Sequence, residues 1–291
     1  MTYVVAAALA DRAFGDPRRF HPVAGFGRAA TALERVLWRD SRAAGAVHTA
    51  TLVGAVYAAA RAVDRSWWLR VALVWATLGG RSLERAASRL ADAVARGDLA
   101  EARALAPTLV GRDPALLDGD GLVRAAVESL AENTSDAVVA PLVWAALLGA
   151  PGAAAYRAVN TLDAMVGRRD ERYARFGWAA ARADDLASWP GARLTVLLAG
   201  LAGGAPRAAW TAALRDGRRH PSPNAGRVEA AFAGALGLRL GGRTAYAHAV
   251  EDRPMLGAGR TPRPADVARA VRLTRAVTLG AVLLAALGAR R

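Results

Sequence analysis

The stretch AVVAPLVWAALLGAPGAAAY, from Ala137 to Tyr156, is twenty residues long and contains no charged side chain. An α-helix needs about 20 apolar residues to cross the hydrocarbon core of a membrane. The run therefore predicts a membrane-associated helix. Pro141 and the segment Gly149–Gly152 interrupt it, because proline and glycine weaken a helix interior. We expect the run to be broken or re-entrant, or the site to lie at membrane depth within the bundle.

Four other apolar runs are shorter or interrupted by single charges, and they cover residues 43–60, 66–80, 194–214 and 276–289. The whole chain is 54% hydrophobic, above the roughly 45–50% apolar content of soluble domains. We expect an all-α fold, a polytopic membrane bundle in a single domain of residues 1–291. Long helical and loop connections would carry its polar clusters. Between 81 and 124, helical periodicity is interrupted at Gly97-Asp98 and again at Pro107.

The basic residues exclude several chemistries. All 39 are arginine, and the chain has neither lysine nor cysteine. A P-loop and a Schiff base both need lysine, and thiolate catalysis, disulfides and cysteine metal sites need cysteine. With only four histidines, the expected metal is a hard cation on carboxylates. The formal charge of +14 is spread between apolar runs, as in a bacterial inner-membrane protein, so we expect no nucleic-acid partner.

The first polar cluster is ESLAENTSDAVVAPLVW, which starts at Glu128. On a helix, Glu128, Glu132 and Asp136 share one face, with Asn133 beside them. Carboxylates this close repel each other unless a cation lies among them, and Mg²⁺ binds one or two carboxylates together with substrate phosphate. The alternative is that one residue of 134–136 simply caps the apolar helix that follows.

The second cluster is YRAVNTLDAMVGRRD, from Tyr156 to Asp170. Asn160 and Asp163 are three residues apart and form a polar stripe on an otherwise apolar helix. A polar or ionisable side chain at membrane depth is costly and indicates function. The alternative is an exposed helix face at the membrane interface.

The third cluster, FGWAAARADDLASWPGARL, contains the adjacent acids Asp184 and Asp185. Neighbouring helical residues point about 100° apart, so both cannot face one metal. One is expected to bind metal or substrate, while the other pairs with Arg182 or Arg193.

The fourth cluster begins at Arg215 and includes HPSPNAG, residues 220–226. Its prolines predict an extended loop, after which Asn224 or Ser222 caps an alanine-rich helix. A helix N-terminus near His220 and several arginines is an anion site. An ordinary cap with solvated arginines is the alternative.

These stretches occur together with GDP (15–17), HPV (21–23), LVGRD (109–113) and RPMLGAGRTP (253–262). In this order, and over nearly the whole chain, they resemble the adenosylcobinamide-phosphate synthase family of cobalamin biosynthesis, the CbiB/CobD family. Ala137 departs conservatively from the glycine expected after ENTSD.

The resemblance implies an integral membrane enzyme of the bacterial inner membrane whose site faces the cytoplasm. It implies ATP-dependent joining of adenosylcobyric acid to (R)-1-aminopropan-2-ol, or to its O-phosphate, through an amide bond, with Mg²⁺ as the metal. Membrane lipid is an expected partner, as are other late corrinoid-pathway enzymes. An amide is formed from an activated carboxylate, most simply an acyl phosphate, and a neutral amine. Without lysine, arginines must screen the phosphate charge, and a carboxylate or His220 takes the amine proton.

The clusters and the resemblance together give the candidate site residues. The catalytic candidates are Glu128, Glu132, Asn133, Asp136, Asn160, Asp163 and His220. The substrate-binding and phosphate-binding candidates are Arg112, Asp113, Arg182, Asp184, Asp185, Arg218, Arg219, Ser222, Asn224 and His21. The metal candidates are Glu132, Asp136 and Asp163.

Two other functional classes compete with this reading. A CDP-alcohol phosphotransferase is also membrane-bound and Asp-rich, but its signature D-G-x2-A-R-x8-G-x3-D-x3-D is absent. A small-solute permease or transport-complex subunit would place charges inside clean membrane spans, whereas here the polar clusters lie in the long connections.

Overall fold

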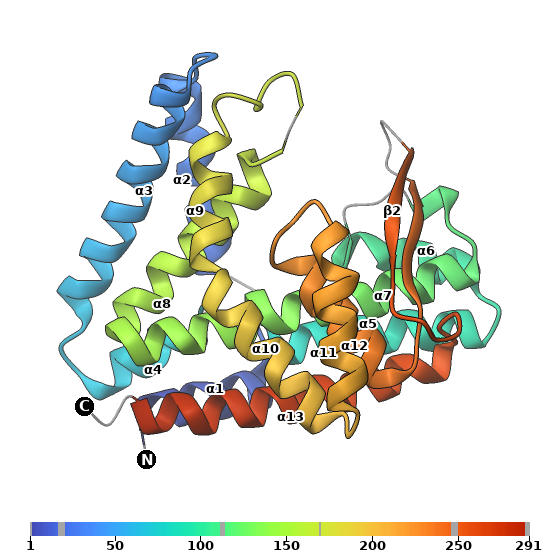
Figure 1. Ribbon diagram of the computed structural model, residues 1–291. Helices are drawn as coiled ribbons and strands as arrows, with labels where there is room; N and C mark the ends of the chain where they lie inside the picture. The colour runs from blue at the N-terminus through green and yellow to red at the C-terminus, as the bar shows by residue number, and fades with distance from the viewer. Residues whose placement is uncertain (1, 17–20, 111–113, 169, 246–249, 289–291) are drawn as a thin grey trace. The chain divides into compact units, whose positions relative to one another are not determined.

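The computed structural model describes residues 2–16, 21–110, 114–168, 170–245 and 250–288. The described chain is helical apart from one two-stranded hairpin (Figure 1), which confirms the all-α prediction. It divides into two compact units. Unit 1 is Met1–Gly79, Asp136–Gly191 and Val282–Arg291, and unit 2 is Gly80–Ser135 and Ala192–Ala281.

Unit 1 contains α1 (Tyr3–Phe14), α2 (Pro22–Leu37), α3 (Arg42–Val63), α4 (Trp67–Trp75), α8 (Ala140–Val166) and α9 (Trp178–Ala187). It packs around a core to which helices α2, α3, α8 and α9 contribute. The core residues Leu52, Leu162 and Phe176 are at most 8% exposed. Gly45 allows α3 to approach the chain at Phe176, because a Cβ there would overlap the Phe176 carbonyl oxygen. Figure 1 shows α3, α8 and α9 side by side, in agreement with their contacts.

The helix that contains the opening stretch is broken where the sequence predicts. Within α8, Gly149 has a φ of 74° and Pro151 follows it. A positive φ is disfavoured for residues with a Cβ, so glycine makes this break possible. Whether the run is re-entrant stays a prediction.

The structure at the start of this run does not agree with the alternative that a residue of 134–136 caps the apolar helix. The helix α7 (Gly119–Thr134) is followed by a π-helical turn, η3 (Ser135–Val139), and then by α8 without a non-helical cap. Thr134 instead donates its hydroxyl hydrogen to the Leu130 carbonyl oxygen at 2.6 Å. The interpretation of residues 134–136 as a helix cap is therefore wrong, since all three lie inside continuous helical structure.

Among the described residues, three helical segments are long and apolar enough to cross a membrane: Arg42–Val63, Gly119–Val166 and Pro264–Gly288. The last is α13. The runs 66–80 and 194–214 form shorter helices. The first gives α4, of 9 residues, and the second is divided between α10 (Trp189–Ala202) and α11 (Pro206–Arg215). At 1.5 Å per residue, a 9-residue helix is about 14 Å long and does not span a bilayer core of about 30 Å.

Unit 2 begins with helices separated as the sequence predicts. These are α5 (Gly80–Ala95) and α6 (Leu99–Leu105), followed by the short turns η1 (Ala106–Thr108) and η2 (Pro114–Leu116). Between α5 and α6, Gly97 has a φ of 79°. Asp98 then caps α6 by accepting a 2.9 Å hydrogen bond from the Glu101 amide. The interruption at Gly97-Asp98 is confirmed.

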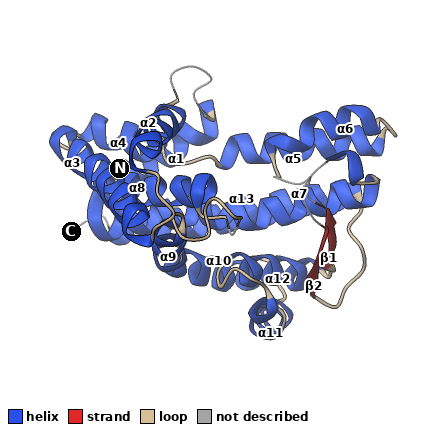
Figure 2. Ribbon diagram, turned by 90° about the horizontal axis from the view of Figure 1, so that it is seen from above, coloured by secondary structure: helices blue, strands red, loops and turns tan. Residues whose placement is uncertain are grey.

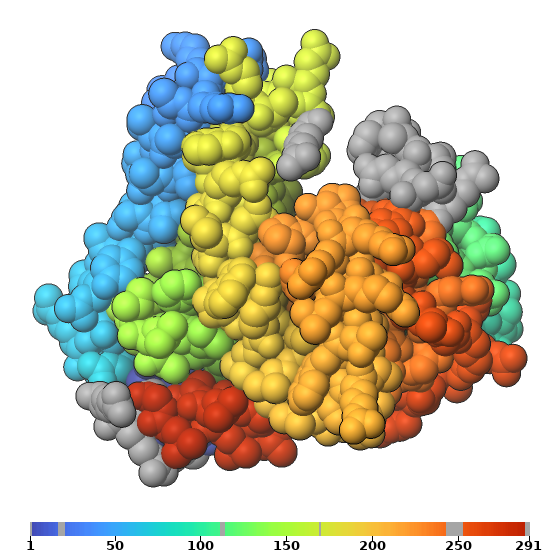
Figure 3. Space-filling model, viewed as in Figure 1, coloured from blue at the N-terminus to red at the C-terminus, as the bar shows by residue number. Residues whose placement is uncertain are grey.

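The remainder of unit 2 contains α11, the turn η4 (Gly217–Arg219), α12 (Ala225–Leu236), and strands β1 (Leu240–Ala245) and β2 (Val250–Leu256). Helices α11 and α12 pack side by side, and their surface is orange in Figure 3. The strands pair antiparallel, with an irregularity between Leu240 and Gly242. Figure 2 shows this hairpin, in red, beside the end of α7. The sequence prediction of loop and helix over 215–275 missed it.

Candidate functional site

A polar cavity of about 280 Å³ lies inside unit 2. It brings together four predicted site residues, from α7 and from the loop before α12. Two further charged residues, Glu229 and Arg253, line the same cavity, and the sequence did not single them out. The lining residues are Leu109, Val110, Glu128, Ser129, Glu132, His220, Pro221, Ser222, Ala225, Glu229 and Arg253.

Three glutamates line this cavity, and two of them are almost inaccessible to solvent. Glu128 and Glu229 are each 3% exposed, whereas Glu132 is intermediate. Glu128 accepts a 2.7 Å hydrogen bond from the Gly241 amide, and Arg124 Nε lies 3.9 Å from the same Oε1. Buried carboxylates need such donors. Glu128 is therefore fixed by the hairpin, and Glu132 is the most accessible of the three acids.

His220 lines the cavity from the loop before α12. Its Nδ1 accepts the Ser222 amide hydrogen at 3.1 Å, while Nε2 lies 3.5 Å from Arg253 Nη1. Gly226 makes room for the ring, because a Cβ at residue 226 would overlap the His220 Cβ. The imidazole is thus held by the loop backbone and by a glycine of the following helix.

The N-terminus of α12 opens on the same cavity through Ala225. Ser222 Oγ accepts hydrogen bonds from the amides of Asn224 (3.3 Å) and Ala225 (3.1 Å), so Ser222 is the capping side chain. Asn224 has another role, since its Oδ1 accepts from Arg193 Nη1 at 2.8 Å. Of the two predicted caps, the structure selects Ser222. Arg218 and Arg219 lie exposed on η4, and their phosphate role stays a prediction.

Unit 1 contains a second polar group, a chain of hydrogen bonds between α8 and the end of α9. Asn160 Nδ2 and Ser188 Oγ each donate to Asp184 Oδ1, both at 3.2 Å. The Tyr156 hydroxyl lies 3.1 Å from Ser188 Oγ. Arg157 Nη1 donates to Asn160 Oδ1 at 3.2 Å. The predicted residues Asn160 and Asp184 are therefore brought together.

The two adjacent aspartates have the different partners that helical geometry predicts. Burial raises the pKa of Asp184, the hydrogen bonds from Asn160 and Ser188 oppose the shift, and the charge of Asp185 adds to it. Asp185 instead forms an ion pair with Arg182 at 2.9 Å. Asp184 is therefore the member of the pair that belongs to the polar network.

Several other predicted residues have local roles. His21 caps α2, because its Nδ1 accepts the Val23 amide hydrogen at 3.2 Å. Asn133 donates back to the Ser129 carbonyl oxygen at 3.0 Å. Asp163 lies near the end of α8 against Gly167, where a Cβ would overlap its carboxylate. Asp136 lies in the π turn and does not line the cavity of unit 2. Arg112 and Asp113 lie outside the described residues.

Within the described ranges, no group of three or more histidine and acidic side chains is arranged to hold a metal ion. The predicted metal residues are divided between the units, with Glu132 in unit 2 and Asp136 and Asp163 in unit 1. That ligand set stays a prediction. Carboxylate oxygens are nonetheless the donors that suit Mg²⁺, and the cavity of unit 2 supplies them from three glutamates.

Sequence reasoning missed Glu229 and Arg253 in the cavity, and Ser188 in the network of unit 1. Glu229 is a single acid in an alanine-rich helix, and Arg253 is one of 39 arginines, so neither has a local signal. Glu229 is 3% exposed within the alanine-rich helix α12.

Comparison with known proteins gives one consistent result. The family model described as CobD/Cbib protein matches residues 4–274. The cobalamin biosynthesis protein CobD of Mycobacterium tuberculosis is 55% identical over 292 residues, which cover 97% of this chain and 93% of the relative. Those of Geobacter metallireducens and Rhodobacter capsulatus are 46% and 42% identical, each covering 97% of this chain and 95% of the relative. No solved structure matches.

Proposed function

Because this chain belongs to the CobD/CbiB family, we propose that it acts in cobalamin biosynthesis as a membrane ligase. The proposed reaction joins the carboxylate of adenosylcobyric acid to (R)-1-aminopropan-2-ol, or to its O-phosphate, as an amide. ATP is the proposed co-substrate. The location is the inner membrane, with the reacting groups facing the cytoplasm, where ATP and the corrinoid are present.

The observation that carries this proposal is the composition of the cavity in unit 2. Glutamates, an imidazole and a guanidinium surround about 280 Å³, in a chain that has no lysine or cysteine. Ligation requires a general base for the amine and positive groups near phosphate, and it needs no covalent nucleophile on the enzyme. These are the groups that the cavity offers. A cavity of this size suits the small amine better than the corrinoid.

The geometry favours a glutamate over His220 as the base. The Nδ1 of His220 already accepts the Ser222 amide hydrogen. Arg253 Nη1, which can only donate, lies 3.5 Å from Nε2, so both ring nitrogens face hydrogen-bond donors and neither is open to the amine. Glu128 accepts from Gly241, and Glu229 is almost fully buried. Glu132, the most accessible acid, is the group that would take the proton as the nitrogen attacks.

Positive charge near phosphate would come from two directions in unit 2. Arg253 lines the cavity on the side of the hairpin. Ala225, the first residue of α12, lines the cavity, and a helix N-terminus favours anions. Mg²⁺, held by glutamates of the cavity together with substrate phosphate, would supply charge neutralisation. The carboxylate donors fit that ion better than a soft metal.

The purified protein in detergent, incubated with ATP, Mg²⁺, adenosylcobyric acid and each amine, tests the proposal. We expect an amide product, followed by mass spectrometry, and loss of product with Glu132→Gln. Glu101→Gln is the matched control, since Glu101 is an exposed acid of unit 2 outside the cavity. If the folded protein forms no amide with either amine, the ligase assignment is wrong. Transport of substrate without turnover would support the permease alternative instead.

The cytoplasmic orientation has its own test, because the chain contains no cysteine. Single cysteines next to Glu132 and next to His220, which both line the cavity of unit 2, would be labelled in intact cells and in inverted vesicles. We expect labelling from the cytoplasmic side, reduced by substrate. Labelling of the two positions from opposite sides, with neither protected by substrate, would contradict a shared site.

A further inference from the structure

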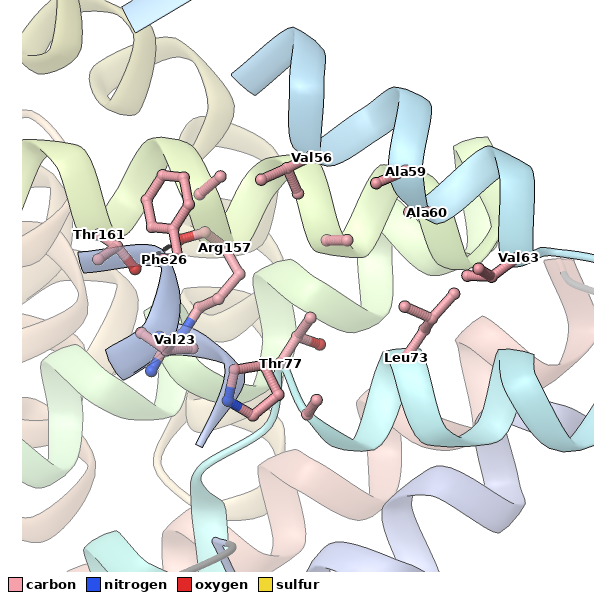
Figure 4. Close-up of a pocket in the computed structure, with 14 residues that line it drawn as sticks. Val23, Phe26, Val56, Ala59, Ala60, Val63, Leu73, Thr77, Arg157 and Thr161 are labelled. Atoms are coloured by element: carbon pink, nitrogen blue, oxygen red, sulfur yellow. Dashed lines mark hydrogen bonds between the residues drawn. The ribbon is translucent and has the colours of Figure 1, made fainter. Parts of the chain in front are cut away.

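Unit 1 contains a second cavity, of about 300 Å³, between helices α2, α3, α4 and α8. Figure 4 shows that residues from α2 and α8, among them Phe26, Arg157 and Thr161, gather at one end. Val63 of α3 and Leu73 of α4 lie at the other end. Cavities that hold small organic ligands begin at about this volume.

The walls offer a ligand almost no polar group. Helix α3 contributes only valine and alanine. The two threonine hydroxyls are already used, since Thr77 donates to the Val74 carbonyl oxygen and Thr161 to the Arg157 carbonyl oxygen, both at 2.7 Å. Arg157 is the one charged side chain among the lining residues that the structure describes. The cavity is therefore an apolar space with a cation at one end.

The charge of Arg157 is only indirectly balanced. Its Nη1 donates to a neutral amide oxygen, Oδ1 of Asn160, which in turn contacts Asp184. Its Nε is buried and has no hydrogen-bond partner in the described part of the chain. Within those same residues no carboxylate forms an ion pair with Arg157. A half-buried cation without a counter-ion is costly, above all at membrane depth, so this geometry favours an anionic ligand.

We propose that this cavity binds an aliphatic monocarboxylate, with the carboxylate on Arg157 and the alkyl chain along α3. Arg157 can match one negative charge, and among the described lining residues no other side chain offers a free donor. A phosphate dianion needs more donors than one guanidinium supplies. From Val56 to Val63 the wall is eight residues of helix, and the seven steps of 1.5 Å between them make it about 10 Å long. That length suits a medium-chain acid rather than a bulky ring system.

A carboxylate of this kind has two possible sources, and both share the chemistry that Arg157 recognises. One is a free fatty acid of the surrounding membrane. The other is a carboxylate arm of the proposed substrate. The binding proposal itself does not rest on the ligase function, because binding is measured without turnover.

The test measures thermal unfolding of the purified protein in non-ionic detergent with octanoate, octylamine or octanol at equal concentrations. A ligand that binds the native state raises the unfolding temperature with its concentration. We expect a rise with octanoate alone. Equal effects of all three compounds would show partitioning into an apolar space and would overturn the proposal.

Variants distinguish the contribution of the Arg157 charge from that of the cavity volume. Arg157→Met should remove the response to octanoate, whereas Arg157→Lys, which retains the charge, should keep part of it. Ala59→Trp fills the cavity and should also abolish the response. Ala58→Trp, on the same helix but exposed and outside the lining, should not. If Arg157→Met folds and responds to octanoate as the wild type does, the proposed role of Arg157 is wrong.

A competition experiment then assigns the source. Octanoate that inhibits ligation competitively against the corrinoid places the substrate's carboxylate in this cavity. Octanoate that binds without competing, in a protein that co-purifies with fatty acid, places a membrane-derived acid there. Both results retain the carboxylate site, and the absence of octanoate binding removes it.

Discussion

The amide of Gly241 donates a 2.7 Å hydrogen bond to Oε1 of Glu128, which joins the start of the hairpin to the middle of α7. Both groups are buried, so loss of the acceptor leaves an unsatisfied amide. We expect Glu128→Ala to lower the free energy of unfolding by about 1–3 kcal/mol. Glu128→Gln retains an acceptor oxygen and should cost less. Chemical unfolding in detergent measures both values.

Hydrogen exchange at the Gly241 amide is the specific readout for this contact. It should accelerate in Glu128→Ala and stay near the wild-type rate in Glu128→Gln. Unchanged exchange in the alanine variant would show that the carboxylate does not hold the hairpin.

The pH dependence of stability should contain a component from Asp184. Burial raises its pKa above the ordinary 3.8. Between the ordinary and the raised value the native state binds more protons than the unfolded state, so the free energy of unfolding falls as pH rises through that window. Asp184→Asn should remove this slope. Asn160→Ala removes a donor to the carboxylate, so it should raise the pKa further and lower stability at neutral pH.

Asp216 should act in the opposite direction. Its hydrogen bonds with Arg215 lower its pKa, with the Gly257 amide contributing, although burial opposes the shift. The stabilisation is present above the unfolded-state pKa and is lost as pH falls through the lowered native value. Thermal unfolding between pH 3 and pH 7 should show that Asp216→Asn flattens the acid limb. An identical acid limb in variant and wild type would contradict this role.

The position of His220 should depend on Gly226. A Cβ at residue 226 would overlap the His220 side chain, so Gly226→Ala must move the loop before α12. We expect amide formation to fall at least tenfold while the protein still inserts and folds. Gly54→Ala is the control, because a Cβ at that glycine meets no atom within 4 Å. If Gly226→Ala retains wild-type activity, amide formation does not depend on the position of this loop.

The breaks in the helices could be predicted from the sequence, because single residues cause them. Gly97 and Gly149 both adopt positive φ, and both were expected from glycine beside Asp98 or near Pro151. The π turn at Ser135–Val139 could not be predicted, since no residue in that stretch disfavours an ordinary α-helix. The hairpin was missed because LGGRTA lacks the alternation of a half-buried strand.

The candidate site was predictable only where acids cluster along the chain. Glu128 and Glu132 lie one helical turn apart and both line the cavity of unit 2, as their spacing predicts. Glu229 and Arg253 reach the same cavity from α12 and β2. Contacts between residues so far apart along the chain cannot be recognised from the spacing of residues in one sequence. The spacing argument also included Asp136, which does not line that cavity. The π turn that begins at Ser135 and contains Asp136 alters the helical phase on which that argument depends.

The break at Gly149 changes how the membrane topology of this chain should be counted. It divides the twenty uncharged residues 137–156 into twelve before the glycine and seven after it. At 1.5 Å per residue these pieces are about 18 Å and about 11 Å long, each shorter than a bilayer core of about 30 Å. If a hydropathy analysis counts this run as one straight membrane crossing, that count decides on which side of the membrane the later segments lie. Two short apolar stretches that meet at a bend, within helices that continue on both sides, do not determine that side.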